Sequence, residues 1–338
     1  SVGLEGAFDT LLRGKNGRIM QQRMSGQIWR PIQIGNNQLP VNGKDIVTTL
    51  DVRIQDIAQY SLQKGLEAES ADHGCVIVME TKTGAIKAIA NLTRGEDNKY
   101  YETQNYAVSE FTEPGSTFKV VSAIALLEDG YVKPTDSIDN NWGKWTWYDK
   151  PWSDSKKPPK RFYTLSECLQ YSSNIGTSKF VMQHYKKNPK KFTNHILDLG
   201  LHLKPKFDIP SSSNPTVPTP DDASWSGTSL PSLSIGYSSN LSPLQVLMLY
   251  NTIANKGKMM QPYMVKEIRL EGQTLSKIEP IVIKEKAFSA ATAAAVTNTM
   301  QIVEYHVKYN TTTNQTHLKQ TTLVVGGKVT PRKKGLPF

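Results

Sequence analysis

The sequence lacks any apolar run long enough to cross a bilayer. A membrane-spanning helix needs about 20 consecutive apolar residues, whereas the longest mostly apolar run, Val120 to Leu127, has 8. No signal-like segment opens the sequence either. Because the chain starts at Ser1 in what has the character of mid-domain sequence, we expect any export or anchor segment to lie upstream of it.

Cysteine and histidine are scarce, with 2 and 6 copies in 338 residues. Cys75 and Cys168 lie far apart, which excludes a disulfide framework or a cysteine-rich metal site. We interpret both as small buried hydrophobic residues. The histidines show no metal-ligand spacing, and no glycine-rich phosphate loop precedes a helix. The sequence therefore predicts neither a metal nor a cofactor.

Acidic residues are outnumbered, with 30 Asp and Glu against 40 Lys and Arg and a net charge of +10. Such a balance can indicate nucleic acid, a membrane surface or another anionic polymer as a partner. The lysines are spread along the chain, with their densest stretches at 156–161 and 186–191, and no nucleic-acid-binding motif accompanies them. We therefore expect solvated loop faces near an anionic lipid or polymer, and no nucleic acid.

Hydrophobic residues make up 38% of the chain, enough for one large domain and a smaller piece. Residues 1–45 are rich in glycine and predict loops and short strands, while 131–163 and 205–232 predict a surface insertion and a loop-rich excursion. Strands are predicted at 45–50, 75–80, 85–91 and 323–325, and helices at 51–66, 116–128, 175–187, 243–254 and 287–303. The capping box Thr164-Leu165-Ser166-Glu167 opens a further short helix. Because no regular βαβ rhythm appears, the sequence predicts an α+β fold with a mainly antiparallel sheet flanked by helices.

The strongest chemical signal is Ser116-Thr117-Phe118-Lys119, just after Glu113-Pro114-Gly115. Residues i and i+3 of a helix lie on one face, so the Ser116 hydroxyl and the Lys119 amine can approach each other. Serine needs a base to become a nucleophile, and lysine can serve if burial or nearby cations lower its pKa. The backbone amides at the helix start could stabilise an oxyanion. By itself this spacing also fits an ordinary helical surface.

A second signal is Ser172-Ser173-Asn174, just before a predicted helix. Ser172 could relay a proton between the base and a leaving amine, and Asn174 could hydrogen-bond Lys119 and a substrate amide. Alone, the pattern is more typical of a helix N-cap, and its chemical interpretation depends on the other motif.

A serine acyl-enzyme site with these two motifs should also have a Lys-[Ser/Thr]-Gly strand that faces the nucleophile. The literal match is Lys82-Thr83-Gly84. It precedes Ser116 and falls between two predicted strands, where Thr and Gly are favourable turn residues. We therefore interpret it as a hairpin turn.

The segment from Glu113 to Lys119, followed by Tyr171 to Gly176, resembles the class B penicillin-binding proteins, and the septum-specific members slightly more than the elongation-specific ones. Further similar segments cover most of the chain, at 3–12, 43–55, 83–86, 234–236, 242–245 and 253–255. The resemblance implies the fold that these D,D-transpeptidases share with serine β-lactamases. It further implies that residues 1–42 are the end of an N-terminal pedestal region and 43–338 the transpeptidase domain.

The resemblance also implies an activity. Ser116, with Lys119, Ser172 and Asn174, would attack the penultimate D-Ala of a peptidoglycan stem peptide, release the terminal D-Ala and pass the acyl group to a neighbouring amine. β-Lactams would acylate Ser116. The implied partners are a membrane glycosyltransferase and proteins of cell division or elongation. The implied location is the outer, periplasmic face of the cytoplasmic membrane.

One segment departs from the family pattern. Where the family has Lys-Thr-Gly-Thr, this chain has Lys328-Val329-Thr330-Pro331. By register, Lys328 and Thr330 are the expected substrate-binding residues, but Val329 lacks the expected hydroxyl. Pro331 has no N–H to complete an oxyanion hole, and losing one such donor lowers a rate roughly 10²–10³-fold. A C-terminus that is truncated or altered, without the family's last strand and helix, would explain this departure.

Two alternatives remain. Ser-Thr-Phe-Lys also resembles class D β-lactamases and β-lactam sensors, although the matches at 3–9 and 43–51 argue against that group. Pro331 and the missing end would instead fit a catalytically impaired scaffold within a division or elongation complex.

Overall fold

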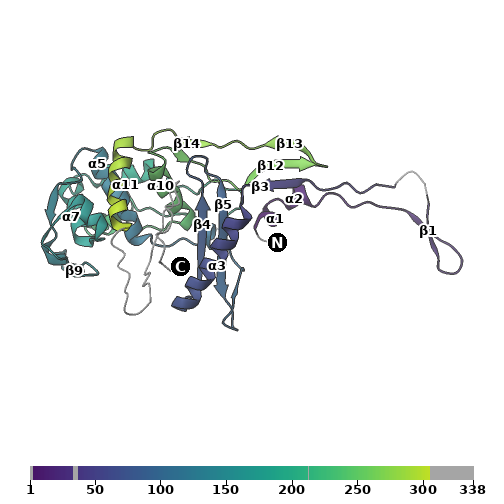
Figure 1. The fold of residues 1–338 in the computed structure, drawn as a ribbon, viewed down its shortest axis with the longest axis horizontal. Helices are drawn as coiled ribbons and strands as arrows, with labels where there is room; N and C mark the ends of the chain where they lie inside the picture. Colours follow the sequence, from purple (N-terminus) through teal and green to yellow (C-terminus); the bar gives the residue numbers. More distant parts are fainter. Residues whose placement is uncertain (1–2, 33–36, 212, 305–338) are drawn as a thin grey trace, which may run out of the picture.

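The computed structural model describes residues 3–32, 37–211 and 213–304, which form a body of helices and antiparallel strands with a long arm projecting from one end (Figure 1). Among the described residues, no helix is both long and apolar enough to cross a membrane. The predicted strand at 323–325 and the segment from Lys328 to Pro331 lie outside the described residues.

A three-stranded antiparallel sheet lies in the middle of the molecule, in the order β4 (His73–Met79), β5 (Ile86–Arg94) and β6 (Tyr100–Tyr101). The predicted hairpin is thus confirmed, with each strand slightly longer than expected. Its connection contains Lys82-Thr83-Gly84, and Gly84 has φ +83°, a conformation that favours glycine. The prediction that this match is a turn is also confirmed.

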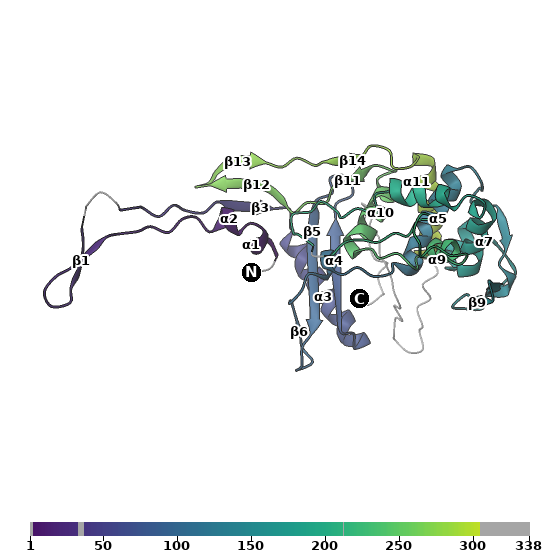
Figure 2. The same ribbon diagram turned by 180° about the vertical axis from the view of Figure 1, so that it is seen from behind.

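Both faces of this sheet are covered. Helix α3 (Val52–Glu69) packs Ala58, Leu62 and Leu66 against two alanines and one leucine of β5 (Figures 1 and 2). Its start is the predicted one, because the Asp51 side chain accepts hydrogen bonds from the amides of the second and third residues of the helix. The other face contacts α4 (Tyr106–Ser109) and α10 (Pro243–Ala254) through an apolar cluster that includes Leu244.

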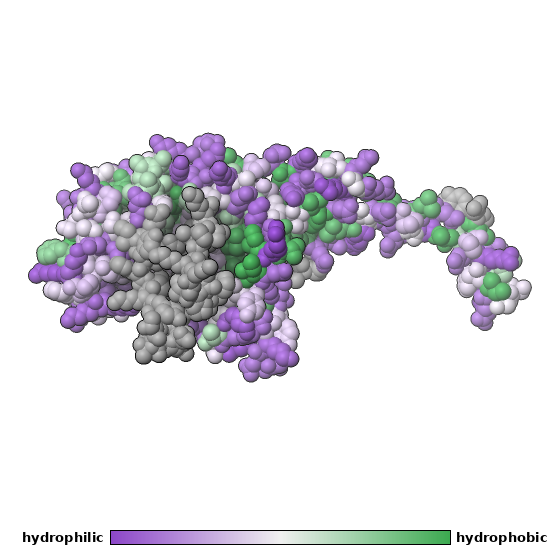
Figure 3. All heavy atoms as spheres, viewed as in Figure 1, coloured by the Kyte–Doolittle hydropathy of each residue, from purple (hydrophilic) through white to green (hydrophobic). Residues whose placement is uncertain are grey.

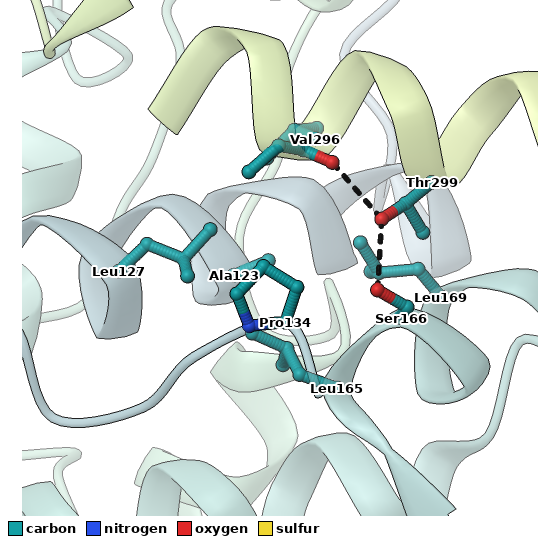
Figure 4. Close-up of a pocket in the computed structure, with 9 residues that line it drawn as sticks. Ala123, Leu127, Pro134, Leu165, Ser166, Leu169, Val296 and Thr299 are labelled. Atoms are coloured by element: carbon teal, nitrogen blue, oxygen red, sulfur yellow. Dashed lines mark hydrogen bonds between the residues drawn. The ribbon is translucent and has the colours of Figure 1, made fainter. Parts of the chain in front are cut away.

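The second half of the body is helical and surrounds α5 (Lys119–Glu128), in which eight of ten residues are buried. Around it lie α6 (Leu165–Gln170), α7 (Asn174–Tyr185), α8 (Pro189–Asp198), α9 (Ser229–Ser234) and α11 (Ala290–Glu304). The capping boxes at Thr164 and Ser242 start α6 and α10 as predicted. Figure 4 shows α11 against α5 and α6, with Thr299 hydrogen-bonded to Ser166 at 3.1 Å.

The prediction of a surface insertion at 131–163 is wrong in part. This segment contains β7 (Ser137–Asp139), β8 (Lys144–Trp147), β9 (Lys150–Ser153) and β10 (Phe162–Thr164), together with the short 3₁₀ turn η2 (Asn141–Gly143). Antiparallel pairs join β7 to β10 and β8 to β9, and Tyr163 is fully buried. The high content of lysine and proline concealed the two-residue alternation of β8, in which Trp145 and Trp147 are half-buried and their neighbours exposed.

Residues 1–45 contain two short helices that the glycine-rich sequence did not predict, α1 (Gly3–Ala7) and α2 (Asp9–Leu12). Beyond them, β1 (Gln21–Arg23) and β2 (Trp29–Pro31) pair within the arm, along which hydrophobic residues are scattered among hydrophilic ones (Figure 3). The division at residue 43 into a pedestal region and a transpeptidase domain stays a prediction.

The remaining strands form two small antiparallel sheets. β3 (Asp45–Thr48) pairs with β12 (Val265–Leu270), which also pairs with β13 (Gln273–Lys277). β11 (Met259–Met260) pairs with β14 (Val282–Lys284). All these pairs are antiparallel, as the predicted α+β fold requires.

Candidate active site

Ser116 lies in a short 3₁₀ helix, η1 (Gly115–Phe118), which leads directly into α5. The sequence predicted an α-helix from Ser116, but regular α-helix begins at Lys119. In a 3₁₀ helix, residues i and i+3 lie directly above one another because one turn takes about 3.0 residues. Lys119 Nζ accordingly lies 3.0 Å from Ser116 Oγ. Ser116 is exposed, whereas the Lys119 side chain is buried at 2% exposure.

The tight turn before Ser116 is held by a segment far away in the sequence. Gly115 has φ +55° and donates its amide hydrogen to the carbonyl oxygen of Gly236 at 3.0 Å. Gly236 also has a positive φ, and a Cβ atom there would lie 2.0 Å from the Gly115 oxygen. No side chain fits at this contact, so residue 236 must be glycine for η1 to keep this position.

Two hydroxyl groups secure the same helix. The Ser122 hydroxyl of α5 donates to the Ser234 carbonyl of α9 at 2.6 Å. The Tyr250 hydroxyl of α10 donates to the Thr117 carbonyl at 3.0 Å. Contacts with α9 and α10 therefore hold η1 and α5, and with them Ser116, in place.

The amine of Lys119 contacts three oxygen atoms. Besides Ser116 Oγ, they are the carbonyl oxygen of Ser172 at 2.7 Å and Ser172 Oγ at 3.0 Å. Burial lowers the pKa of Lys119 from its ordinary value to about 8, although the negative charge of Asp154 acts in the opposite direction. A fraction of the molecules near neutral pH therefore has a neutral Lys119 amine that can accept a proton.

Ser172, Ser173 and Asn174 form a turn between α6 and α7 whose middle residue has a structural role. Ser173 Oγ accepts the amide hydrogen of Gly176 at 2.9 Å and is the N-cap of α7. The cap expected as an alternative thus exists, but at Ser173, which leaves the side chains of Ser172 and Asn174 for other contacts. Ser172 has φ +53°, a strained value for a residue other than glycine.

Asn174 lies beside this cluster without joining it. Its amide donates to the carbonyl oxygen of Ser153, in β9, at 3.1 Å. Within the described part of the chain, no hydrogen bond connects Asn174 to Lys119, so the contact expected from the sequence is not made here.

Asp154 is a residue that sequence reasoning missed. Its carboxylate accepts the Ser173 hydroxyl hydrogen at 2.8 Å and the Ile175 amide hydrogen at 2.9 Å. Both bonds fix the turn that presents Ser172 to Lys119. No spacing rule could have found Asp154, because 19 residues separate it from Ser173 and it follows a segment that resembled a solvated loop.

The two cysteines have the predicted character in part. Cys168 is fully buried and Cys75 half-buried, and both thiols are free. Burial raises the pKa of the Cys75 thiol to about 12 and that of the Cys168 thiol further still. Both therefore stay protonated and unreactive. Among the described residues, no group of three histidine, cysteine or carboxylate side chains could hold a metal ion.

Residues 74–329 match the model of a protein family described as penicillin binding protein transpeptidase domain. The chain belongs to this family. Penicillin-binding protein PbpB of Mycobacterium tuberculosis is 29% identical over 318 residues, which are 89% of this chain and 44% of that protein. The probable peptidoglycan D,D-transpeptidase PenA of Neisseria flavescens is 28% identical over 266 residues, or 76% of this chain and 64% of that protein.

Solved structures agree with this assignment. The crystal structure of penicillin-binding protein 3 from Mycobacterium tuberculosis in its apo form has a TM-score of 0.74 at 26% identity, over 93% of this chain and 66% of that one. The expected class B penicillin-binding protein and its α+β transpeptidase fold are therefore confirmed. The chain spans less than two thirds of the length of these relatives.

Proposed function

We propose that this chain is an acyl-serine D,D-transpeptidase that cross-links peptidoglycan stem peptides and is acylated by β-lactams. One observation carries the proposal: a buried amine with a pKa near 8 lies 3.0 Å from two serine hydroxyls, and one of these is exposed. This is the arrangement that a serine nucleophile requires, with the base in place before substrate arrives.

The proposed reaction starts when neutral Lys119 takes the proton from Ser116 Oγ. The oxygen attacks the penultimate D-Ala carbonyl, and the developing oxyanion receives a hydrogen bond from the Ser116 amide, which has no acceptor inside the first turn of its helix. The proton then passes from Lys119 through Ser172 to the leaving amine, and terminal D-Ala departs. An acceptor amine then attacks the ester carbonyl and gives a proton to Lys119 by the same route. As the new amide bond forms, the Ser116 ester bond breaks and Lys119 returns the proton to Ser116 Oγ.

The other expected residues take supporting roles in this proposal. Asn174 would turn from Ser153 to the substrate amide, and Lys328 and Thr330 would bind the substrate carboxylate. The site would lie on the periplasmic face of the cytoplasmic membrane. A membrane glycosyltransferase and proteins of division or elongation would be its partners.

The test is an intact mass spectrum of the protein after incubation with benzylpenicillin, together with nitrocefin turnover. We expect one stable adduct per molecule and no steady hydrolysis, because a transpeptidase lacks an efficient route for water to the acyl-enzyme. Steady hydrolysis would contradict the proposal and favour a β-lactamase. A folded protein without adduct at high penicillin concentration would favour the scaffold.

The rate of acylation should depend on pH through Lys119. Only the neutral amine accepts a proton, so the rate is expected to rise with pH around a midpoint near 8 instead of the ordinary 10.5. Asp154→Asn removes the charge that raises the pKa of Lys119, so its midpoint should move to lower pH. Acylation rates of both proteins across a pH series that brackets 8 measure this. A midpoint near 10.5, or no movement in the folded variant, would contradict the assigned base.

A further inference from the structure

A pocket lies on the side of α7 that faces β7 and β8, and Ser116 is not among its lining residues. Its volume is about 360 Å³, within the range of small-ligand sites. Eight residues line it: Ile138, Asp139, Trp145, Trp147, Lys179, Met182, Gln183 and Lys186. We call it the tryptophan–lysine pocket.

The aromatic wall of this pocket is firmly positioned. The rings of Trp145 and Trp147 have centroids 5.1 Å apart and are tilted by 34°. The Trp147 indole N–H donates to the Gly227 carbonyl at 2.9 Å, and this hydrogen bond restricts rotation of the ring. A fixed pair of indole rings offers a ligand broad apolar surface at little cost in side-chain entropy.

The two lysines of the pocket differ in the groups that surround them. Lys186 Nζ lies 4.7 Å from the Trp147 ring centroid, and Lys179 Nζ donates to the Asp139 backbone carbonyl at 2.8 Å. The Asp139 carboxylate forms its own bidentate pair with Arg161, 2.7 Å at its shortest. Among the described residues, no carboxylate is within ion-pair distance of either lysine, but the charge of Asp139 acts on Lys179. Lys186 is therefore the ammonium group that remains available to an anionic ligand.

The segment that contains the pocket residues, 131–191, is also positively charged and rich in tryptophan. Residues 131–191 contain twelve of the chain's 40 Lys and Arg but five of its 30 Asp and Glu, so they hold most of its positive excess. Four of the six tryptophans lie within 142–152. An anionic ligand with an apolar face would fit both features.

Helix α7 and the β8–β9 hairpin carry residues of the pocket and also residues of the active site. Asn174 begins α7, and the rise of about 1.5 Å per residue places Lys179 and Lys186 roughly 8 and 18 Å further along the helix axis. Ser153, which accepts the hydrogen bond from Asn174, ends β9 of the β8–β9 hairpin that carries both tryptophans. Both views place α7 and β9 at the end of the body opposite the arm (Figures 1 and 2).

We propose that the tryptophan–lysine pocket binds an acidic glycopeptide unit of the peptidoglycan strand, with a sugar ring against Trp145 and Trp147 and a stem-peptide carboxylate at Lys186. The inference rests on the proposed function, because that activity brings this polymer to the protein. A strand held here would keep its neighbouring stem peptides within reach of Ser116 and would raise their local concentration.

The test measures the binding of fluorescein-labelled, uncross-linked peptidoglycan strands by anisotropy, in the presence of saturating benzylpenicillin. Penicillin blocks Ser116, so the remaining binding reports the tryptophan–lysine pocket. Lys186→Glu is compared with Lys187→Glu, which makes the same charge change at the next residue, outside the pocket. We expect the first variant to weaken binding by about tenfold or more, the loss of one charge-assisted contact, and the second to change it little.

The outcomes separate the two proposals. Equal losses in both variants would overturn the pocket in favour of diffuse attraction. So would equally strong competition by a single-stranded oligonucleotide, since a basic aromatic groove can also bind nucleic acid. An adduct at Ser116 without strand binding would refute the pocket and leave the transpeptidase intact, whereas Lys186-dependent binding without an adduct would refute the transpeptidase alone.

Discussion

Ser116→Ala is expected to abolish the covalent adduct with benzylpenicillin. The hydroxyl is exposed and lies 3.0 Å from the buried amine of Lys119, and alanine offers no atom that could form the ester. An intact mass spectrum after incubation with the antibiotic measures this directly.

A matched control is Ser166→Ala. Ser166 is a serine of α6 whose hydroxyl bonds that of Thr299 at 3.1 Å (Figure 4), and among the described residues no hydrogen bond joins it to Lys119. This variant should form the adduct as the unaltered protein does. An adduct of unchanged stoichiometry on Ser116→Ala would place the nucleophile elsewhere and would refute the assigned site.

Lys119→Arg is expected to slow acylation by roughly 10²–10⁴-fold, the contribution of a general base. A guanidinium group keeps its proton at every accessible pH, so it can donate hydrogen bonds to the two serines but cannot accept the Ser116 proton. The second-order rate constant with benzylpenicillin measures the loss.

Because a permanent charge at a buried position can destabilise the fold, Lys119→Gln and a thermal unfolding curve accompany this variant. Lys179→Arg is the matched control. Burial also lowers the pKa of Lys179, yet its amine bonds the Asp139 carbonyl instead of a catalytic serine. A folded Lys119→Arg protein that is acylated as fast as the Lys179→Arg control would show that Lys119 is not the base.

Local sequence signals predicted several elements correctly. Asp51, Thr164 and Ser242 each begin a helix, because an N-cap depends on hydrogen bonds to amides two or three residues ahead. The hairpin of β4 and β5 followed from β-branched runs around a glycine turn. These features depend on neighbours in the chain, so a single sequence contains the information they need.

The elements that were missed depend on distant contacts. β12, β13 and α8 received no prediction, and the strands of 131–163 were concealed by lysine and proline. β12 acquires its place by pairing with β3, more than 200 residues earlier. The expected contact between Asn174 and Lys119 failed for a related reason: β9 offers the Ser153 carbonyl, and the position of β9 is decided by packing.

The sequence alone determined the chemical groups of this protein and their family, since Ser116 and Lys119 are one turn apart and Ser172 begins the second motif. The tertiary structure decided whether these groups can react. The Lys119 amine is desolvated because segments more than 50 residues away in the sequence, including the turn at Ser172, pack around it. This desolvation lowers its pKa to about 8. Packing of distant segments also brings Asp154 to the turn that contains Ser172, where it accepts two hydrogen bonds. The same packing places the lysines of α7 beside the tryptophans of β8. Desolvation and three-dimensional proximity belong to the folded chain, so local spacing could not have revealed them.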